Sequence, residues 1–338
     1  MSHHPTPLKF LGPGWFAIVM GLCGLSLAWH RAAPLMGESA TAGALVLGAV
    51  ALLVPLALAA LSLLRWQRHP AAMADDLKHP VRHPFVAAWP ISLILLATVV
   101  TALTGPSWPA QALWLVGASW QFAVTVWVLA RWLRDGAGLA WPTVTPVLIL
   151  PVVGNVLTPL AGVTLGFSQW SAAQFGIGLL LWPVVLALLA TRLAVKGLWS
   201  QGLLPATFIA LAPPAVIGVA ALELGAPPAL AWMCWGVALF FLAWAMSVFR
   251  RAISQPFALS FWAMSFPLAA FSALTLRLAD TGGAAFQVLA MLALAFSSLV
   301  IAALSLATVK GLREGSLLAP EPVAMLQAAG ADPAQTSP

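Results

Sequence analysis

The chain has very little charge and no tyrosine. Of its 338 residues only 7% are Asp, Glu, Lys or Arg, whereas soluble globular proteins carry about 25%. Hydrophobic residues make up 62% of the chain. This composition excludes an ordinary soluble domain. It indicates an integral membrane protein whose outer surface contacts membrane lipid.

Cysteine is also scarce. The two cysteines, Cys23 and Cys234, lie in separate apolar runs and form no CxxC motif. Disulfide, redox and thiolate-metal chemistry are therefore not expected, and we interpret both as small buried apolar residues. The sequence predicts no metal site and no cofactor.

Acidic residues are absent from the middle of every long apolar run. Catalysis or a proton relay inside a membrane needs ionisable groups at depth. The six histidines also lie in polar segments or at a run's end, and we interpret those of the 65–84 loop as solvated residues rather than metal ligands. We therefore expect no enzyme, and passive conduction or uniport through an uncharged passage remains. The nine acidic residues are Glu38, Asp75, Asp76, Asp135, Glu223, Asp280, Glu314, Glu321 and Asp332.

Long apolar runs are what the sequence does contain. Barrel strands would show short segments that alternate between apolar and polar residues, whereas these runs match the ~20 residues that a helix needs to cross a bilayer. We expect an all-α integral membrane protein with residues 1–9 as a cytoplasmic N-terminus, 10–310 as the transmembrane pore domain and 311–338 as a disordered cytoplasmic tail. The predicted spans are 10–30, 40–64, 85–104, 108–131, 142–163, 171–195, 203–224, 227–249, 256–279 and 284–309.

Lysine and arginine indicate the orientation, because cytoplasmic loops are enriched in them. With both termini in the cytoplasm, only Arg31 and Arg277 of the 15 basic residues lie on the outer side. Several of the 17 tryptophans lie at span ends, where indole rings anchor a helix at the headgroup level. The bias therefore predicts an even number of spans with both termini inside.

Prolines separate the odd-numbered spans from the even ones. Each odd span contains at least one, so the chain resembles five copies of a helical hairpin, and such repeats pack side by side. Kinked helices are tolerated where neighbours satisfy the freed carbonyls, which favours the odd spans as the inner helices of a quasi-fivefold ring around a central pore. The predicted kink residues are Pro13, Pro90, Pro151, Pro213 and Pro267.

Uncharged polar residues in the odd spans are candidates for lining a passage. Hydroxyl and amide groups replace part of an ion's hydration shell weakly enough to let it leave, although they also serve to tie helices together. Asn155 and Ser265 are the first candidates because each flanks a proline region, and Ser260 is a further one.

Four motifs carry a resemblance to a known family. The stretches GWFAIVMGLCGLSLAW, DLKHPVR, LAPPAV and FWAMSFPLAAFSALT occur in that order between residues 8 and 312. Together they resemble the tellurite-resistance/dicarboxylate transporter family, which includes bacterial permeases, fungal malate and sulfite transporters and the plant guard-cell slow anion channel. Ala17 departs from the glycine that is common after the motif aromatic Phe16, which we count as another lining candidate.

The resemblance implies an architecture and a gate. Family members have ten helices in five hairpins, and they form homotrimers with a separate pore in each subunit. For this chain the resemblance implies a location in the bacterial inner (plasma) membrane. A phenylalanine on the ninth helix closes the pore, and its match here is Phe266, beside Pro267. We expect the proline to bend the helix so that the ring projects into the passage.

The sequence thus predicts an anion channel or passive anion transporter for small inorganic or organic anions, with no nucleic-acid partner. A basic cytoplasmic mouth concentrates anions, and an uncharged pore favours weakly hydrated ones. The main alternative is a permease for C4-dicarboxylate, sulfite or tellurite. A membrane-embedded redox subunit and a scaffold are further alternatives, disfavoured by the missing mid-membrane ligands and by the kinked helices respectively.

Overall fold

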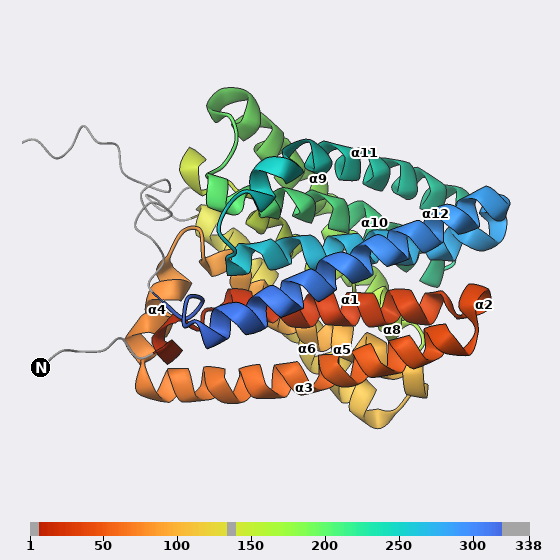
Figure 1. Cartoon of the computed structure of the whole chain (residues 1–338), viewed down its shortest axis with the longest axis horizontal. Coiled ribbons are helices and arrows are strands. Elements are labelled where there is room, and N and C mark those ends of the chain that lie inside the picture. Colours follow the sequence, from red (N-terminus) through yellow and green to blue (C-terminus); the bar gives the residue numbers. More distant parts are fainter. Residues whose placement is uncertain (1–6, 134–139, 320–338) are drawn as a thin grey trace, which may run out of the picture.

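The computed structural model describes residues 7–133 and 140–319, and within them the regular structure is helical without strands. The all-helical prediction is confirmed for this part of the chain, while residues 1–6 and most of the predicted tail, 320–338, lie outside it (Figure 1). The α-helices are α1 (Ala17–Arg31), α2 (Ala33–Met36), α3 (Glu38–Arg68), α4 (Pro70–Lys78), α5 (Ala88–Thr104), α6 (Trp108–Ala130), α7 (Leu150–Val156), α8 (Pro159–Gly162), α9 (Ser168–Lys196), α10 (Ala212–Glu223), α11 (Pro228–Ile253) and α12 (Ser265–Arg313).

Eight helical stretches among the described residues are long and apolar enough to cross a membrane. The prediction of ten spans differs at two places. The fifth span is the shorter apolar stretch Pro146–Gly162, which is interrupted between α7 and α8. The last two spans fall in the single stretch Leu259–Arg313, where Gly283 has a non-helical φ of 75° that suits a residue without a Cβ. The count of ten stays a prediction.

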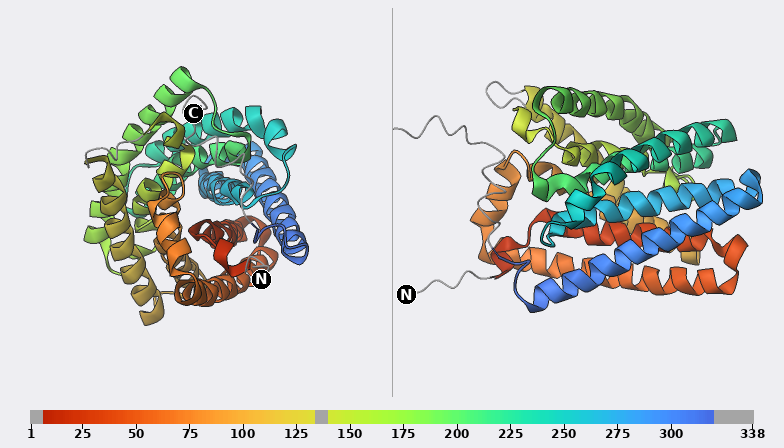
Figure 2. Two further views of the ribbon diagram at one scale, coloured as in Figure 1. Left: turned by 90° about the vertical axis from the view of Figure 1, so that its left-hand side faces the viewer. Right: turned by 45° about the horizontal axis from the view of Figure 1, so that its top comes forward.

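Burial alternates along the chain between inner and outer helices. In the most apolar window of Gln201–Glu223, 94% of the residues are buried, compared with 22% in the next stretch, Pro228–Ile253. In the end-on view of Figure 2, α3, α6, α9 and α11 lie on the outside of the bundle. These outer helices expose large aliphatic side chains, as expected for a surface that faces lipid.

Each buried odd-numbered span begins with a 3-10 helix and continues as an α-helix. A 3-10 helix rises about 2.0 Å per residue and an α-helix about 1.5 Å, so the first part of each span covers more depth with fewer residues. Runs longer than four residues are uncommon, yet Gln201–Leu211 contains 11. The five 3-10 segments are Pro13–Phe16 before α1, His83–Ala87 before α5, Pro146–Ile149 before α7, Gln201–Leu211 before α10 and Leu259–Met264 before α12.

The five predicted kink prolines lie near these junctions rather than in the middle of an α-helix. Pro151 and Pro213 are the second residues of α7 and α10, and Pro90 and Pro267 are the third residues of α5 and α12. Proline is tolerated in the first α-helical turn because its missing N–H would have no intrahelical partner there. Pro13 differs, since it begins the 3-10 segment and α1 starts four residues later. The expected mid-helix kinks are therefore changes of helix type.

The bundle has two distinct ends (Figure 1). We call them the α2 end, where α1 and α10 finish, and the α4 end, where the short helix α4 lies across the bundle. Because the inner segments run in the same direction, their 3-10 parts lie toward the α4 end and their α-helical parts toward the α2 end.

Candidate functional site

A cavity of about 330 Å³ lies among the inner helices and extends to the α2 end. Its lining residues come from α1, α5, α8 and the turn after it, α10 and the first half of α12. None comes from the outer helices α3, α6, α9 or α11. Segments from all five predicted hairpins thus contribute to one enclosure.

The cavity stops at the level of Phe266. The first lining residues of four inner helices, counted from their 3-10 segments, are Gly24, Leu95, Ala215 and Phe266. The 3-10 segments contribute no lining residue. The enclosure therefore occupies the α-helical parts of the inner spans and has Phe266 at its closed end.

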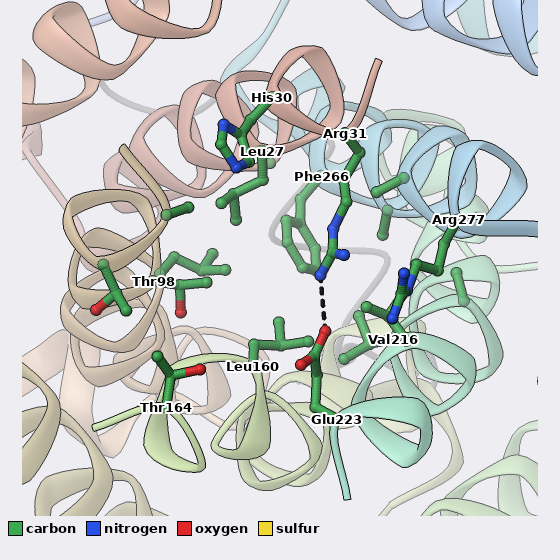
Figure 3. A pocket seen from close by; sticks show the side chains of 18 residues that line it. Leu27, His30, Arg31, Thr98, Leu160, Thr164, Val216, Glu223, Phe266 and Arg277 are labelled. Carbon is green, nitrogen blue, oxygen red and sulfur yellow. Dashed lines mark hydrogen bonds and ion pairs between the residues drawn. The ribbon is translucent and has the colours of Figure 1, made fainter. Parts of the chain in front are cut away.

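Two glycines of α1 allow the start of α12 to pack closely. A Cβ on Gly24 would lie 3.1 Å from Cδ2 of Phe266, and a Cβ on Gly21 would lie 2.3 Å from Oγ of Ser265. The Phe266 side chain, which is only 5% exposed, therefore rests against the backbone of α1 with its ring beside the cavity (Figure 3). Sequence analysis missed both glycines, although their spacing of three puts them on one helix face.

The threonines of α5 that line the cavity have their hydrogens directed away from it. The Thr98 hydroxyl donates to the carbonyl of Ile94 at 2.8 Å, and the Thr101 hydroxyl donates to the carbonyl of Ala97 at 2.7 Å. Such back-bonding leaves oxygen lone pairs and methyl groups toward the enclosure. These hydroxyls therefore offer an anion no free donor.

Charged donors lie at the α2 end of the cavity (Figure 3). Nη2 of Arg31 donates to Oε1 of Glu223 at 2.8 Å, and Arg277 and His30 complete the ionisable lining. With a neutral imidazole, the formal charge of this group is +1. Sequence analysis placed these residues at span ends and assigned them no role, although Arg31 and Arg277 are the two basic residues outside the cytoplasmic set.

Asn155 does not line this cavity. It is fully buried, and its Nδ2 donates to Oγ1 of Thr125 at 2.8 Å and to the carbonyl of Pro151 at 3.0 Å. The same carbonyl accepts from the side chains of Thr125 and Gln121 of α6. In the described conformation the amide ties α7 to α6 at the proline.

The other predicted lining residues also lie outside the cavity. The Ser265 hydroxyl donates to the carbonyl three residues earlier at 2.6 Å, and the Ser260 hydroxyl donates to the carbonyl of Gly202 at 2.7 Å. The ring of Phe16 meets Trp89 edge to face with centroids 6.1 Å apart. Among the predicted site residues, Phe266 is the one that reaches the cavity.

A partly buried ion cluster fastens the α4 end. The two carboxylate oxygens of Asp76 accept from Arg65 at 2.7 Å and from Arg82 at 2.8 Å. Nε of Arg65 also donates to the carbonyl of Lys9 at 3.1 Å. The cluster joins the end of α3, α4, the DLKHPVR loop and the N-terminal segment, so that motif has a structural function here.

Metal ligation finds no support among residues 7–133 and 140–319, where no group of three or more His, Cys, Asp or Glu side chains has the arrangement to hold an ion. Both cysteines are free, with Cys23 buried and Cys234 half-buried.

Comparison with known proteins adds a family. The family model described as voltage-dependent anion channel, SLAC1, matches residues 11–309. The tellurite resistance protein TehA homolog of Haemophilus influenzae is 26% identical over 315 residues, which cover 92% of this chain and 93% of the relative. The S-type anion channel SLAH2 of Arabidopsis thaliana is 25% identical over 237 residues, 69% of this chain and 45% of the relative.

A third relative is named for export. The sulfite efflux pump SSU1 of Trichophyton rubrum is 22% identical over 306 residues, which cover 79% of this chain and 81% of the relative. The family model spans nearly all of the helical part of the chain, and these relatives include the groups that the four sequence motifs indicated. The chain belongs to the SLAC1 family of anion channels and transporters.

Proposed function

We propose that the protein is an anion channel or passive anion transporter whose pathway runs between the five inner segments and is closed by Phe266. The observation that carries the proposal is the cavity itself. It draws its lining from the inner segments alone, and it ends where the Phe266 ring lies. An apolar ring in a narrow passage blocks ions by its volume and by excluding water.

The proposal extends to the whole assembly. Ten membrane helices form five hairpins in a quasi-fivefold ring, and three chains assemble with a separate pore in each. The alternation of buried and exposed stretches supports the ring, and the apolar outer helices supply surface for contact with lipid and other copies. The location is the bacterial inner membrane, with the α4 end and both termini in the cytoplasm, as the Lys and Arg bias supports.

The direct test removes the ring. Phe266→Ala, reconstituted in liposomes, should raise nitrate and chloride flux by roughly ten-fold or more, since each ~1.4 kcal/mol taken from a barrier speeds passage tenfold. Phe271→Ala is the matched control, because Phe271 is buried on the same helix, is stacked on Trp235 and does not line the cavity. Equal flux in the two folded variants would contradict the gate.

A permease for C4-dicarboxylate, sulfite or tellurite is the second candidate. The presence of two guanidinium groups, those of Arg31 and Arg277, in one cavity favours it, because two cations suit a doubly charged oxyanion. Uptake that saturates and depends on pH would distinguish this function from a channel, in which flux follows the electrochemical gradient alone.

A further inference from the structure

The Arg31–Glu223 ion pair joins two helices that are not packed against each other. Arg31 is the last residue of α1, and Glu223 is the last residue of α10. Helix α1 packs on α3, α5 and α12, whereas α10 packs on α11, α12 and α7. The pair therefore reaches from one side of the cavity to another, past α12, as Figure 3 shows.

The position of the pair places it on the route to Phe266. Both partners line the cavity, and each is the last lining residue of its helix toward the α2 end. The Phe266 ring lies at the opposite limit of the same enclosure. An anion that moves between the α2 end and the ring passes the guanidinium of Arg31.

Besides Arg31, the side chains of the cavity lining that carry donor groups are His30, Thr98, Thr101, Thr164 and Arg277. The α5 threonines direct their hydrogens to the backbone. Arg277 of α12 also lines the cavity, and within the described residues it makes no ion pair or hydrogen bond. A guanidinium without a partner, close to one that holds a carboxylate, is suited to bind a small anion.

The ion pair is exposed enough to be exchanged. The side chains of Arg31 and Glu223 are 30% and 22% exposed, and ion pairs open to water contribute little free energy. A carboxylate held in this way can be displaced by an anion from solution, whereas a fully buried partner could not leave without stranding its counter-charge.

We propose that Arg31 and Arg277 form an anion-binding site at the α2 end, and that Glu223 is a tethered anion that competes with the permeating ion for it. The inference rests on the proposed function and adds a second control point to Phe266. Glu223 raises the anion concentration needed to occupy the site. When anions are scarce, the Arg31–Glu223 ion pair stays formed. The ligand is a small inorganic anion such as nitrate or a halide.

The flux test uses the Phe266→Ala protein, so that the ring no longer limits passage. Replacing Glu223 by Gln should lower the half-saturating nitrate concentration on the α2 side by roughly two- to five-fold, the range that an ion pair of this exposure corresponds to. Arg277→Gln should raise that concentration. Glu38→Gln is the matched control, because Glu38 is an exposed carboxylate at the same end and does not line the cavity.

The proposed function and the competing carboxylate can each be contradicted separately. If Phe266→Ala carries no anion current, the proposed function fails. If Phe266→Ala conducts but Glu223→Gln behaves like Glu38→Gln, the function stands and the competing carboxylate is refuted. If Glu223→Gln does not fold, Glu223→Asp takes its place. Its shorter side chain reaches Arg31 less well, so it should also lower the half-saturating nitrate concentration.

A binding measurement without flux provides the second readout. Crystals of the Glu223→Gln protein soaked in bromide should show an anomalous peak within contact distance of Arg31 or Arg277, stronger than in crystals of the unchanged protein. Absence of bromide from both guanidinium groups in the folded variant would refute the site.

Discussion

At the α4 end, the side chains of Asp76 and Arg65 form an ion pair that is buried away from water. Asp76 and Arg65 are each only 3% exposed, and both oxygens of the carboxylate are occupied by guanidinium donors. Removing one partner of such a group leaves a buried charge uncompensated, which costs far more than an exposed pair contributes. The turn that follows α4 is therefore fixed in position. His79 lies in this turn, near Asp76 and Arg82.

The pKa of His79 lies below its ordinary value of 6.5, first because the ring is partly buried and then because Arg82 is nearby, while Asp76 opposes the shift. Neutral Nδ1 accepts from the backbone N–H groups of Val81 and Arg82 at 3.2 and 3.3 Å. Protonation at Nδ1 would make it a donor, so both bonds would be lost.

We therefore expect stability to fall as the pH drops. Below ~6.5 the unfolded chain binds a proton at this ring before the folded chain does, so the free energy of unfolding decreases with acidification until the folded pKa is passed. His79→Asn keeps an acceptor in the place of Nδ1 and does not titrate. Between about pH 8 and about pH 5.5, its melting temperature in detergent should fall less than that of the unchanged protein. Identical losses would contradict this account.

The family resemblance indicated the ring that reaches the cavity, but no residue pattern indicated the charges beside it. Phe266 was found because a family motif surrounds it. Asn155 was chosen for its polarity, which in the structure serves a helix contact. Arg31 and Glu223 are 192 positions apart, and their meeting depends on which helix ends come together in space, which no local pattern encodes.

At the scale of secondary-structure elements, too, the sequence predicted some features and not others. The prolines correctly indicated that the inner spans differ from the outer ones, because a residue without an N–H changes backbone hydrogen bonding wherever it occurs. They did not indicate a 3-10 segment on one side and an α-helix on the other. A proline does not specify on which side of it the backbone changes from 3-10 to α-helical hydrogen bonding.

Pro213 and Pro183 allow the junction to be tested. Pro213 lies in the first turn of α10, where it needs no donor, so Pro213→Ala should destabilise the protein by about 0.4–1 kcal/mol through greater freedom of the unfolded chain. Pro183 lies inside α9 and removes an intrahelical hydrogen bond, so Pro183→Ala should stabilise it. Thermal unfolding in detergent compares the two. If Pro213→Ala lowers the melting temperature no more than Pro183→Ala does, proline at the junction does not favour the change of helix type.

The whole molecule combines an apolar exterior with unlike ends. The α4 end carries the Arg65–Asp76–Arg82 cluster, in which the side chains of Arg65 and Asp76 are buried, and the α2 end carries the partly exposed Arg31–Glu223 pair. The buried Arg65–Asp76 contact fixes the architecture, while the Arg31–Glu223 pair is exposed enough to exchange its carboxylate for another anion. This asymmetry suits a conduit whose control lies in its α2 half, between the ion pair and the Phe266 ring.

The orientation of that asymmetry in the membrane is the last prediction. The Lys and Arg bias predicts that the α4 end lies in the cytoplasm, so an anion arriving from outside should meet the Arg31–Glu223 pair before the ring. Asp75 on α4 and Asp280 near the turn of α12 are both exposed and lie at opposite ends. In intact cells a membrane-impermeant maleimide should label Asp280→Cys, and it should label Asp75→Cys only after permeabilisation. The unchanged protein gives the background, since its Cys23 is buried and its Cys234 half-buried. The reverse labelling would place the ion pair in the cytoplasm and make it the inner control point.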